Sequence, residues 1–347
     1  MIAPVGSPRT TMDAPSRSTP VGRPVTDAVV TGIGVVAPDR PGEPWFDPRA
    51  ELGPRGYRYA PPATQYLLAA TRRAVADGGR LDRLPPERRG AAVATNGGLD
   101  PLFGEMDRIV TGADATELSP ALAPYFAINV LGTRLVAEHQ LRGFHLTLTS
   151  PGVAGFEAVE AGWRALAVGR CDTLLVGVTE DGAEQGAVAL VLEPAGAAAG
   201  SGHGRLRAAT LFVPPAAVHD RVRLTAALDG ALGRLAAPGA LIAPATGSAL
   251  THADGGSPVE WSDDAAPVEL FGDGSAVAAA VGAAAAELTG VAPVVRPVGA
   301  GCLAPVLRAA RLFAGPPGEH RLVVATGEGN VAVVRVSVAA RATREGS

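Results

Sequence analysis

The chain contains no lysine, so all 30 of its basic residues are arginines. This absence excludes Schiff-base chemistry and any cofactor anchored on a lysine. The only two cysteines, Cys171 and Cys302, are too far apart in sequence to form a C-x-x-C motif. Neither a metal site nor a disulfide is therefore indicated, and a reduced, cytoplasmic compartment fits this cysteine usage best.

Aromatic residues and long apolar runs are scarce as well. Aromatics make up 4% of the chain, and alanine, glycine and valine dominate, which indicates close backbone packing in place of an aromatic-lined groove. No run approaches the ~18 apolar residues of a membrane span, so no membrane partner is expected. The formal net charge of −4 and the pI near 5.9 give no basis for nucleic-acid binding.

The composition and length of the chain nevertheless allow a large apolar core. Hydrophobic residues make up 47% of the 347 residues, enough for one large domain or two modest ones. Residues 1–27 lack an apolar h-region and are rich in proline, serine, threonine and arginine. We expect them to form a disordered leader and not a signal peptide, with residues 341–347 as a short tail.

The first ordered strand is expected to begin at residue 28 and to run into a glycine turn. The segment Gly32-x-Gly34-x-x-Ala37 superficially matches a dinucleotide-binding fingerprint. That fingerprint needs a helix directly after the glycines, and the prolines at 38, 41, 44 and 48 leave no room for one. We expect no nucleotide and no other cofactor.

Apolar periodicity then alternates between helix and strand along the whole chain. Helices are expected over residues 64–77, 101–111, 129–141, 158–166, 224–235, 275–289 and 303–313. Further strands are expected over residues 89–95, 144–149, 173–178, 186–193, 240–243, 321–326 and 331–336. Such alternation predicts parallel α/β sheets, and the similar rhythm of residues 28–217 and 218–340 suggests an internal duplication.

The most informative stretch is the turn between the strand 144–149 and the helix 158–166. Many enzymes mount a nucleophile on such a turn, because it exposes the side chain and the helix N-terminus stabilises negative charge. This turn offers Pro151, Gly152 and small apolar residues, and only Ser150 carries a nucleophilic atom. The pattern indicates a nucleophile site without its nucleophile.

Several segments, taken in order, resemble the β-ketoacyl synthases of the thiolase superfamily. They are the opening strand from Val29 to Pro38, the run Arg89-Gly90 through Gly97-Gly98, the strands Leu174–Val178 and Gly186–Glu193, and the turn Gly327-Glu328-Gly329-Asn330. Together they cover residues 28–340. The resemblance implies a thiolase-like fold, in which two duplicated α/β halves form a layered αβαβα domain.

The departures from that family remove its catalytic residues. Its nucleophile elbow reads like T-A-C-x-S-G, and aligning Gly155 puts Gly152 at the cysteine position, with Pro151 before it. The family's histidines lie in an H-G-T-G-T loop and a G-H pair, and neither His252 nor His320 has such a context. The loop could correspond to residues 244–248 or 271–275, both without histidine. The family's usual lysine is absent, so condensation by this chain alone is not expected.

A ketosynthase fold without catalytic residues resembles the β subunit, or chain-length factor, of type II polyketide and related polyene synthases. The resemblance implies a heterodimer with a catalytic ketosynthase, a growing chain carried by an acyl carrier protein, and a tunnel at the interface. It places Phe144, Leu146 and Leu148 on the interface strand. The residues it assigns to the tunnel wall, which would otherwise be ordinary core, are Leu102, Phe103, Met106 and Ile109.

Two other classes of function stay open. The chain could be a stand-alone acyltransferase or hydrolase that uses Ser150, although the sequence assigns no histidine to activate that hydroxyl. It could instead be a homodimeric acyl-binding scaffold without a ketosynthase partner. Activity of the chain purified alone distinguishes the first class, and a stable homodimer distinguishes the second.

Overall fold

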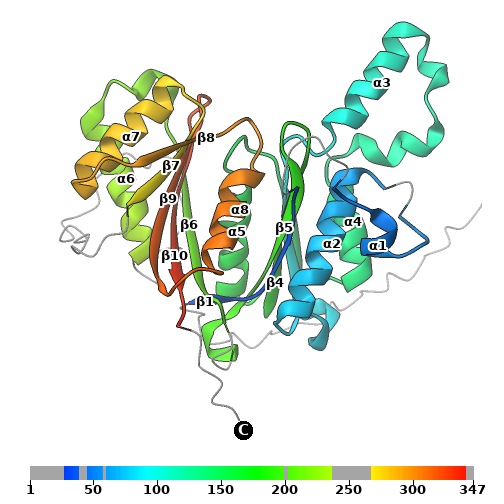
Figure 1. The fold of residues 1–347 in the computed structure, drawn as a ribbon, viewed down its shortest axis with the longest axis horizontal. Helices are drawn as coiled ribbons and strands as arrows, with labels where there is room; N and C mark the ends of the chain where they lie inside the picture. Colours follow the sequence, from blue (N-terminus) through cyan, green and yellow to red (C-terminus); the bar gives the residue numbers. More distant parts are fainter. Residues whose placement is uncertain (1–26, 39–44, 58–59, 199–201, 237–266, 341–347) are drawn as a thin grey trace, which may run out of the picture.

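A computed structural model describes residues 27–38, 45–57, 60–198, 202–236 and 267–340. Ten strands form one sheet in the order β3-β2-β4-β5-β1-β6-β10-β9-β7-β8 (Figure 1). The strands are β1 (Ala28–Val36), β2 (Arg89–Ala94), β3 (Phe144–Leu148), β4 (Thr173–Asp181), β5 (Gln185–Pro194), β6 (Gly204–Phe212), β7 (Val268–Gly272), β8 (Val294–Pro297), β9 (Gly318–Ala325) and β10 (Asn330–Val338). The α-helices are α1 (Pro48–Leu52), α2 (Pro62–Asp77), α3 (Asp100–Gly112), α4 (Val130–His139), α5 (Ala154–Ala167), α6 (Arg221–Ala236), α7 (Ala276–Thr289) and α8 (Leu303–Leu312).

The strand order repeats itself on the two sides of the sheet centre. From the centre outward, β1-β5-β4-β2-β3 and β6-β10-β9-β7-β8 both follow the order first, fifth, fourth, second, third. In each half the second strand pairs in parallel with the third and fourth, and the fifth strand pairs antiparallel with the first and fourth. The halves meet where Val30 of β1 pairs with Gly204 of β6. This repeat is the duplication that the sequence suggested. The first half was expected to extend to residue 217, whereas β6, the first strand of the second half, begins at Gly204.

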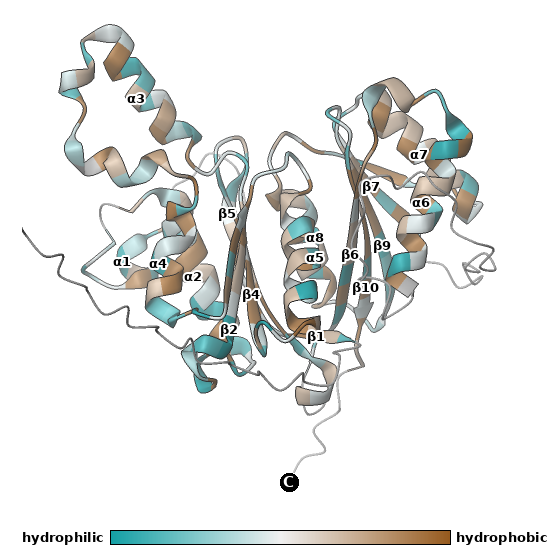
Figure 2. Ribbon diagram, turned by 180° about the vertical axis from the view of Figure 1, so that it is seen from behind, coloured by the Kyte–Doolittle hydropathy of each residue, from teal (hydrophilic) through white to brown (hydrophobic). Residues whose placement is uncertain are grey.

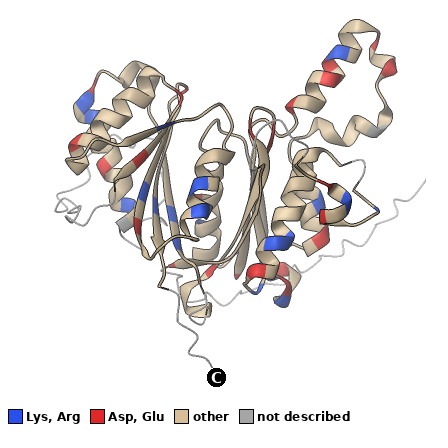
Figure 3. Cartoon of the chain, in the orientation of Figure 1, with Lys and Arg blue, Asp and Glu red and all other residues tan. Residues whose placement is uncertain are grey.

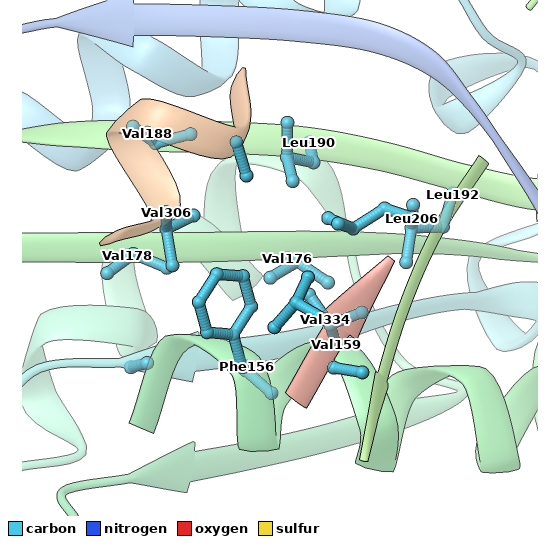
Figure 4. Packing of buried hydrophobic residues seen from close by; sticks show 14 of the residues in the cluster. Phe156, Val159, Val176, Val178, Val188, Leu190, Leu192, Leu206, Val306 and Val334 are labelled. Atoms are coloured by element: carbon cyan, nitrogen blue, oxygen red, sulfur yellow. The ribbon is translucent and has the colours of Figure 1, made fainter. Parts of the chain in front are cut away.

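Helices cover both outer faces of the sheet and fill the space between its two halves. In Figure 1, α2 and α4 lie outside the first half, α6 and α7 lie outside the second, and α5 and α8 lie between them. Figure 4 shows Phe156 and Val159 of α5 and Val306 of α8 packed among side chains of β4, β5, β6 and β10. The result is the five-layer αβαβα arrangement expected of a thiolase-like fold.

The central helices are apolar on more than one side because both are covered by sheet (Figure 2). A Cβ atom at Gly162 of α5 would lie 2.0 Å from Leu174 Cδ2, so glycine permits the close contact with β4. The glycines of the dinucleotide-like segment have the same use. Gly32 and Gly34 lie within β1, and a Cβ at Gly34 would lie 1.8 Å from the Ala70 carbonyl oxygen of α2.

Three strands of the second half, β6, β7 and β8, were not predicted from the sequence. β6 has nine residues, but it follows a glycine-rich segment and its alternation is weakened by Arg205 and Arg207. β7 has five residues and was expected only as a loop, while β8 has four exposed residues bounded by Pro297. Runs this short carry little periodicity, and their pairing is set by neighbouring strands. The expected strand over residues 240–243 lies outside the described residues.

One segment projects from the layered body. α3, the 3-10 helices η3 (Ala115–Glu117) and η4 (Pro120–Phe126), and their connections form residues 100–129, which we call the arm (Figures 1 and 2). Its base is held by the buried residues Leu99 and Leu131, against which Leu102 packs. The arm leaves the sheet after β2, next to the edge strand β3. None of the described helices is long and apolar enough to cross a membrane.

Candidate functional site

The turn from β3 into α5 has the geometry of a nucleophile elbow. Ala154 is the first residue of α5, and its N–H group donates to the Ser150 carbonyl oxygen at 2.9 Å. Gly152, at the apex of the turn, has a φ of +68°, in the left-handed region that glycine adopts without strain. A nucleophile elbow is likewise a sharp and strained turn between strand and helix. Here a residue without a side chain occupies its apex.

The space that a side chain at residue 152 would need is already filled. A Cβ atom built on Gly152 would lie 2.5 Å from Thr326 Cγ2, far inside van der Waals contact. Thr326 follows β9, is 2% exposed, and its hydroxyl has no hydrogen-bond partner among the described residues. The elbow is therefore closed by packing as well as lacking a nucleophile.

A buried carboxyl group organises the region beside the elbow. Glu180, 1% exposed near the end of β4, accepts the backbone N–H groups of Asn96 (2.8 Å), Gly97 (2.6 Å) and Cys302 (3.0 Å). The Cys302 thiol donates to the same carboxyl group at 3.1 Å. Glu180 thus joins the loop after β2 to the start of α8. The sequence analysis missed this residue, although an acidic residue inside a strand of otherwise buried residues was a usable signal.

Cys302 is not a displaced nucleophile. It precedes α8, is fully buried, and lies between the start of α8 and the start of α5. Burial raises the pKa of its thiol well above the ordinary value, and the carboxyl groups of Glu180 and Glu184 raise it further, although the Gly155 N–H group acts in the opposite direction. The thiolate is the reactive form of cysteine, so a thiol with a raised pKa is a poor nucleophile at neutral pH.

Glu184 and Asp273 add two more carboxyl groups close to the elbow. Glu184 accepts the N–H groups of Leu303 (2.9 Å) and Ala304 (3.0 Å) in the first turn of α8. Asp273, after β7, accepts the N–H group of Gly327 at 2.6 Å, directly beside Thr326. The side chains that bind the loops around the elbow are therefore acidic.

Replacing Glu184 by glutamine is expected to change how stability depends on pH. Burial raises the pKa of Glu184 above its ordinary 4.5, Glu180 adds to the effect, and the two N–H groups oppose it. The folded state then binds this proton more tightly than the unfolded state, so the free energy of unfolding falls as Glu184 ionises above pH 4.5. In urea unfolding at several pH values, Glu184→Gln should gain stability relative to wild type as the pH rises.

Glu269→Gln is the control, for which the opposite change in stability with pH is expected. Burial alone would raise the pKa of Glu269, but its bonds to Arg308 and Arg296 lower it below 4.5. That carboxyl group stabilises the fold above pH 4.5 and the contribution is lost as the pH falls through its folded pKa. Glu269→Gln should therefore lose stability relative to wild type as the pH rises. Parallel slopes for the two variants would contradict this assignment.

Ser150 has no catalytic partner in the part of the chain that the structure describes. It is half-buried in the elbow, and no described histidine is hydrogen-bonded to its hydroxyl. His139 is bound to Asp82 and His203 to Asp77, while His320 lies near the start of β9, at the end away from Thr326. His252 lies outside the described residues. Within the same described ranges, no group of three potential metal ligands occurs.

The residues predicted for the tunnel and the interface all lie at the first-half end of the sheet. On the arm, Met106 is buried and Phe103 is 38% exposed, while Leu102 and Ile109 are half-buried. On β3, Phe144 and Leu148 pack partly against the central core, and Leu146 is 37% exposed. Their roles in a tunnel and an interface stay predictions.

The family comparison agrees with this geometry. Residues 42–208, just under half of the chain, match the model of the β-ketoacyl synthase N-terminal domain. This part of the chain is therefore similar to the N-terminal domain of β-ketoacyl synthases. A comparison with curated protein sequences gave no match.

Solved ketosynthases share the fold over most of the chain. The ishigamide ketosynthase/chain length factor superimposes with a TM-score of 0.66 at 16% identity, covering 90% of this chain and 100% of that one. A type II polyketide synthase acyl-carrier protein in complex with its ketosynthase gives 0.63 at 15% identity, covering 90% and 99%. A β-ketoacyl synthase from Burkholderia phymatum gives 0.59 at 14% identity, covering 90% and 100%. Identities this low show the ketosynthase fold alone.

The second half of this ketosynthase fold shows where two sequence patterns lie. Residues 271–275 comprise the last two residues of β7 and the connection to α7, and Asp273 in this connection reaches Gly327 beside the elbow. Gly301 and Cys302 open α8, the helix that corresponds to α5 in the repeated strand order. The alternative position for the H-G-T-G-T loop, residues 244–248, lies outside the described residues.

Proposed function

We propose that the chain is a non-catalytic ketosynthase β subunit, or chain-length factor, that pairs with an active ketosynthase in the cytoplasm. The observation that carries the proposal is the elbow, where glycine stands at the apex and Thr326 occupies the space of a nucleophilic side chain. A ketosynthase needs its cysteine at that apex to form the acyl-enzyme. The chain keeps the fold of such an enzyme and cannot form that intermediate at this position.

The two histidine positions of the family support the same proposal. We assign the H-G-T-G-T loop to residues 271–275, with Phe271 at the histidine position, because they lie at the end of β7 and in the connection to α7, and Asp273 reaches the turn beside the elbow. We assign the G-H pair to Gly301 and Cys302 at the start of α8. A phenylalanine and a buried thiol with a raised pKa supply no positive charge for a decarboxylating extender. Glu180, Glu184 and Asp273 would instead repel a malonyl carboxylate.

The partner is expected at the first-half end of the sheet. β3 pairs only with β2 among the described strands, so its other edge offers unpaired backbone groups. Leu146 on β3 and Phe103 on the arm are both exposed. One solved relative is described as a ketosynthase/chain length factor and another as a ketosynthase in complex with its acyl-carrier protein. We propose that this chain pairs through β3 and the arm, and that an acyl carrier protein brings the growing chain to the complex.

Shortening a side chain on the inner part of the arm is expected to lengthen the product. If Phe103 and Met106 form the end wall of the tunnel, Phe103→Ala or Met106→Ala removes the side chain that stops the growing chain. The test is co-expression with a ketosynthase encoded beside this chain, followed by mass analysis of the carrier-bound product. Val222→Ala, on an exposed residue of α6 far from the arm, is the control and should leave the product unchanged.

Two other outcomes would contradict these proposals. If both arm variants form the 1:1 complex and yield a product of unaltered length, Phe103 and Met106 do not line the tunnel. If the chain condenses or hydrolyses acyl thioesters without any ketosynthase, the proposed function is wrong and Ser150 becomes the residue to replace.

A further inference from the structure

The net charge of the chain is concentrated in the arm. Its thirty residues contain one arginine and five acidic residues, a net charge of −4, which equals the formal net charge of the whole chain. The acidic residues are Asp100, Glu105, Asp107, Asp114 and Glu117. The rest of the protein is therefore balanced, with as many arginines as acidic residues. Figure 3 shows acidic residues, coloured red on the ribbon, along the projecting segment.

The same arm exposes large apolar side chains. Phe103, Val110 and Phe126 are 38%, 41% and 62% exposed. Beyond its base, α3 packs mainly against η3 of the same arm within the part of the chain that the structure describes. Edge strand β3 is adjacent, because the loop that leads into the arm is bonded to it through the Thr95 N–H group and the Leu148 carbonyl oxygen at 3.1 Å. An apolar surface beside an unpaired strand edge is typical of a protein interface.

Within the described ranges, three arginines of the first half already have partners in the chain. Arg142 lies 3.7 Å from Glu87, and Arg72 is bonded to Glu138 at 2.8 Å. Arg134 donates to the Gly56 carbonyl oxygen and lies over the Tyr57 ring.

We propose that the acidic arm determines which partner binds the face made of β3 and the arm. The arm favours a chain with a basic counterpart surface and disfavours a second copy of this chain. A two-fold dimer of identical chains brings the same patch of both copies together, so two arms of charge −4 would share one interface. Like charges across an interface are an effective barrier against the wrong partner. A ketosynthase with surplus arginine or lysine at this face gains attraction from the same residues. This proposal rests on the proposed function, in which the partner binds this face, and adds that the partner's surface is basic.

The test needs only this chain. The arm-neutral variant carries Asp107→Asn, Asp114→Asn and Glu117→Gln, which reduce the net charge of the arm from −4 to −1, and asparagine at residue 114 can still cap η3. The control variant carries Asp220→Asn, Glu287→Gln and Glu319→Gln, which change the net charge equally on the second half. Self-association is measured by analytical ultracentrifugation at about 0.01 M and about 1 M NaCl, where charges are screened beyond about 30 Å and about 3 Å.

We expect wild type to self-associate weakly at low salt, and the arm-neutral variant to self-associate at least about tenfold more tightly. At high salt the two should differ by less than about twofold, and the control should follow wild type throughout. An arm-neutral variant that associates no more tightly than wild type at low salt, including one that stays monomeric, overturns the proposal.

A charge-reversed copy provides a defined basic partner. In an equimolar mixture with wild type, a variant that carries Glu105→Arg, Asp107→Arg, Asp114→Arg and Glu117→Arg, whose arm has a net charge of +4, should form mixed dimers in preference to either homodimer at low salt. A statistical mixture of dimers, or none containing both chains, contradicts the proposal. Because no ketosynthase and no activity enter these measurements, a chain that proved catalytic alone would refute the proposed function without altering their outcome.

Discussion

Replacement of Glu180 by alanine is expected to lower the free energy of unfolding by at least about 3 kcal/mol, because a buried donor left without an acceptor costs about 1–3 kcal/mol. Glu180 accepts the backbone N–H groups of Asn96, Gly97 and Cys302, and all three would lose their acceptor together. Glu180→Gln should fall between alanine and wild type, since its amide keeps one acceptor oxygen and turns an NH₂ group toward donors. Chemical unfolding of the three proteins measures the difference.

Glu193 is the matched control for Glu180. It is equally buried, at 1% exposure, but it accepts only the backbone N–H group of Arg80 (2.7 Å) and lies 3.4 Å from the side chain of that residue. The Arg80 side chain is 35% exposed, so water reaches part of its guanidinium group when Glu193 is replaced, although its Nε atom is buried. Glu193→Ala should therefore cost less than half as much as Glu180→Ala. Equal losses at the two positions would show that Glu180 has no special part in joining the loops around the elbow.

A cysteine at residue 152 is expected to destabilise the fold without restoring condensation. The left-handed backbone at Gly152 costs a side chain about 1–2 kcal/mol, and the overlap with Thr326 adds about 1–3 kcal/mol. Even if the thiol were accommodated, it would face Glu180, Glu184 and Asp273 in place of the family's histidines and lysine. We expect no condensation of an acyl thioester with a malonyl extender by Gly152→Cys alone.

The steric part of this cost can be isolated with two further substitutions. Gly169 has a φ of +71° and no heavy atom within 4 Å of a built Cβ, so Gly169→Ala measures the backbone cost alone. Gly152→Ala should cost about 1–3 kcal/mol more than Gly169→Ala, and Thr326→Ala should remove most of that excess when combined with it. Additive losses in the Gly152–Thr326 double-mutant cycle would mean that Thr326 does not close the elbow.

Thr326→Val should leave the fold as stable as wild type or more stable. Its shape is unchanged, and the buried Thr326 hydroxyl makes no hydrogen bond among the described residues. Threonine at this position therefore acts as a space-filling side chain.

The sequence predicted the long elements and the layered fold because their signals are local. The apolar face of α2 and the period-2 run of β3 each specify an element without help from the rest of the chain. β7 and β8 were missed since strands of five and four residues are defined by the neighbours they pair with. The turn at Gly152 was found from sequence because proline and glycine between a strand and a helix mark such a turn.

The contacts that close the elbow could not be predicted in the same way. Thr326 and Gly152 are separated by most of the second half, and only the pairing of β9 beside the central helices brings them together. Glu180 and Cys302 are likewise 122 residues apart. Long-range contacts between two halves depend on the packed fold, so composition and periodicity contain no direct signal for them.

The most direct test of the account is to locate the nucleophile in the complex with a co-expressed ketosynthase. The account predicts that replacing the active cysteine of the ketosynthase by alanine abolishes the carrier-bound product, while Ser150→Ala in this chain leaves the product and its yield unchanged. Product that persists without the ketosynthase cysteine and disappears with Ser150→Ala would contradict it, because the chemistry would then lie in this chain.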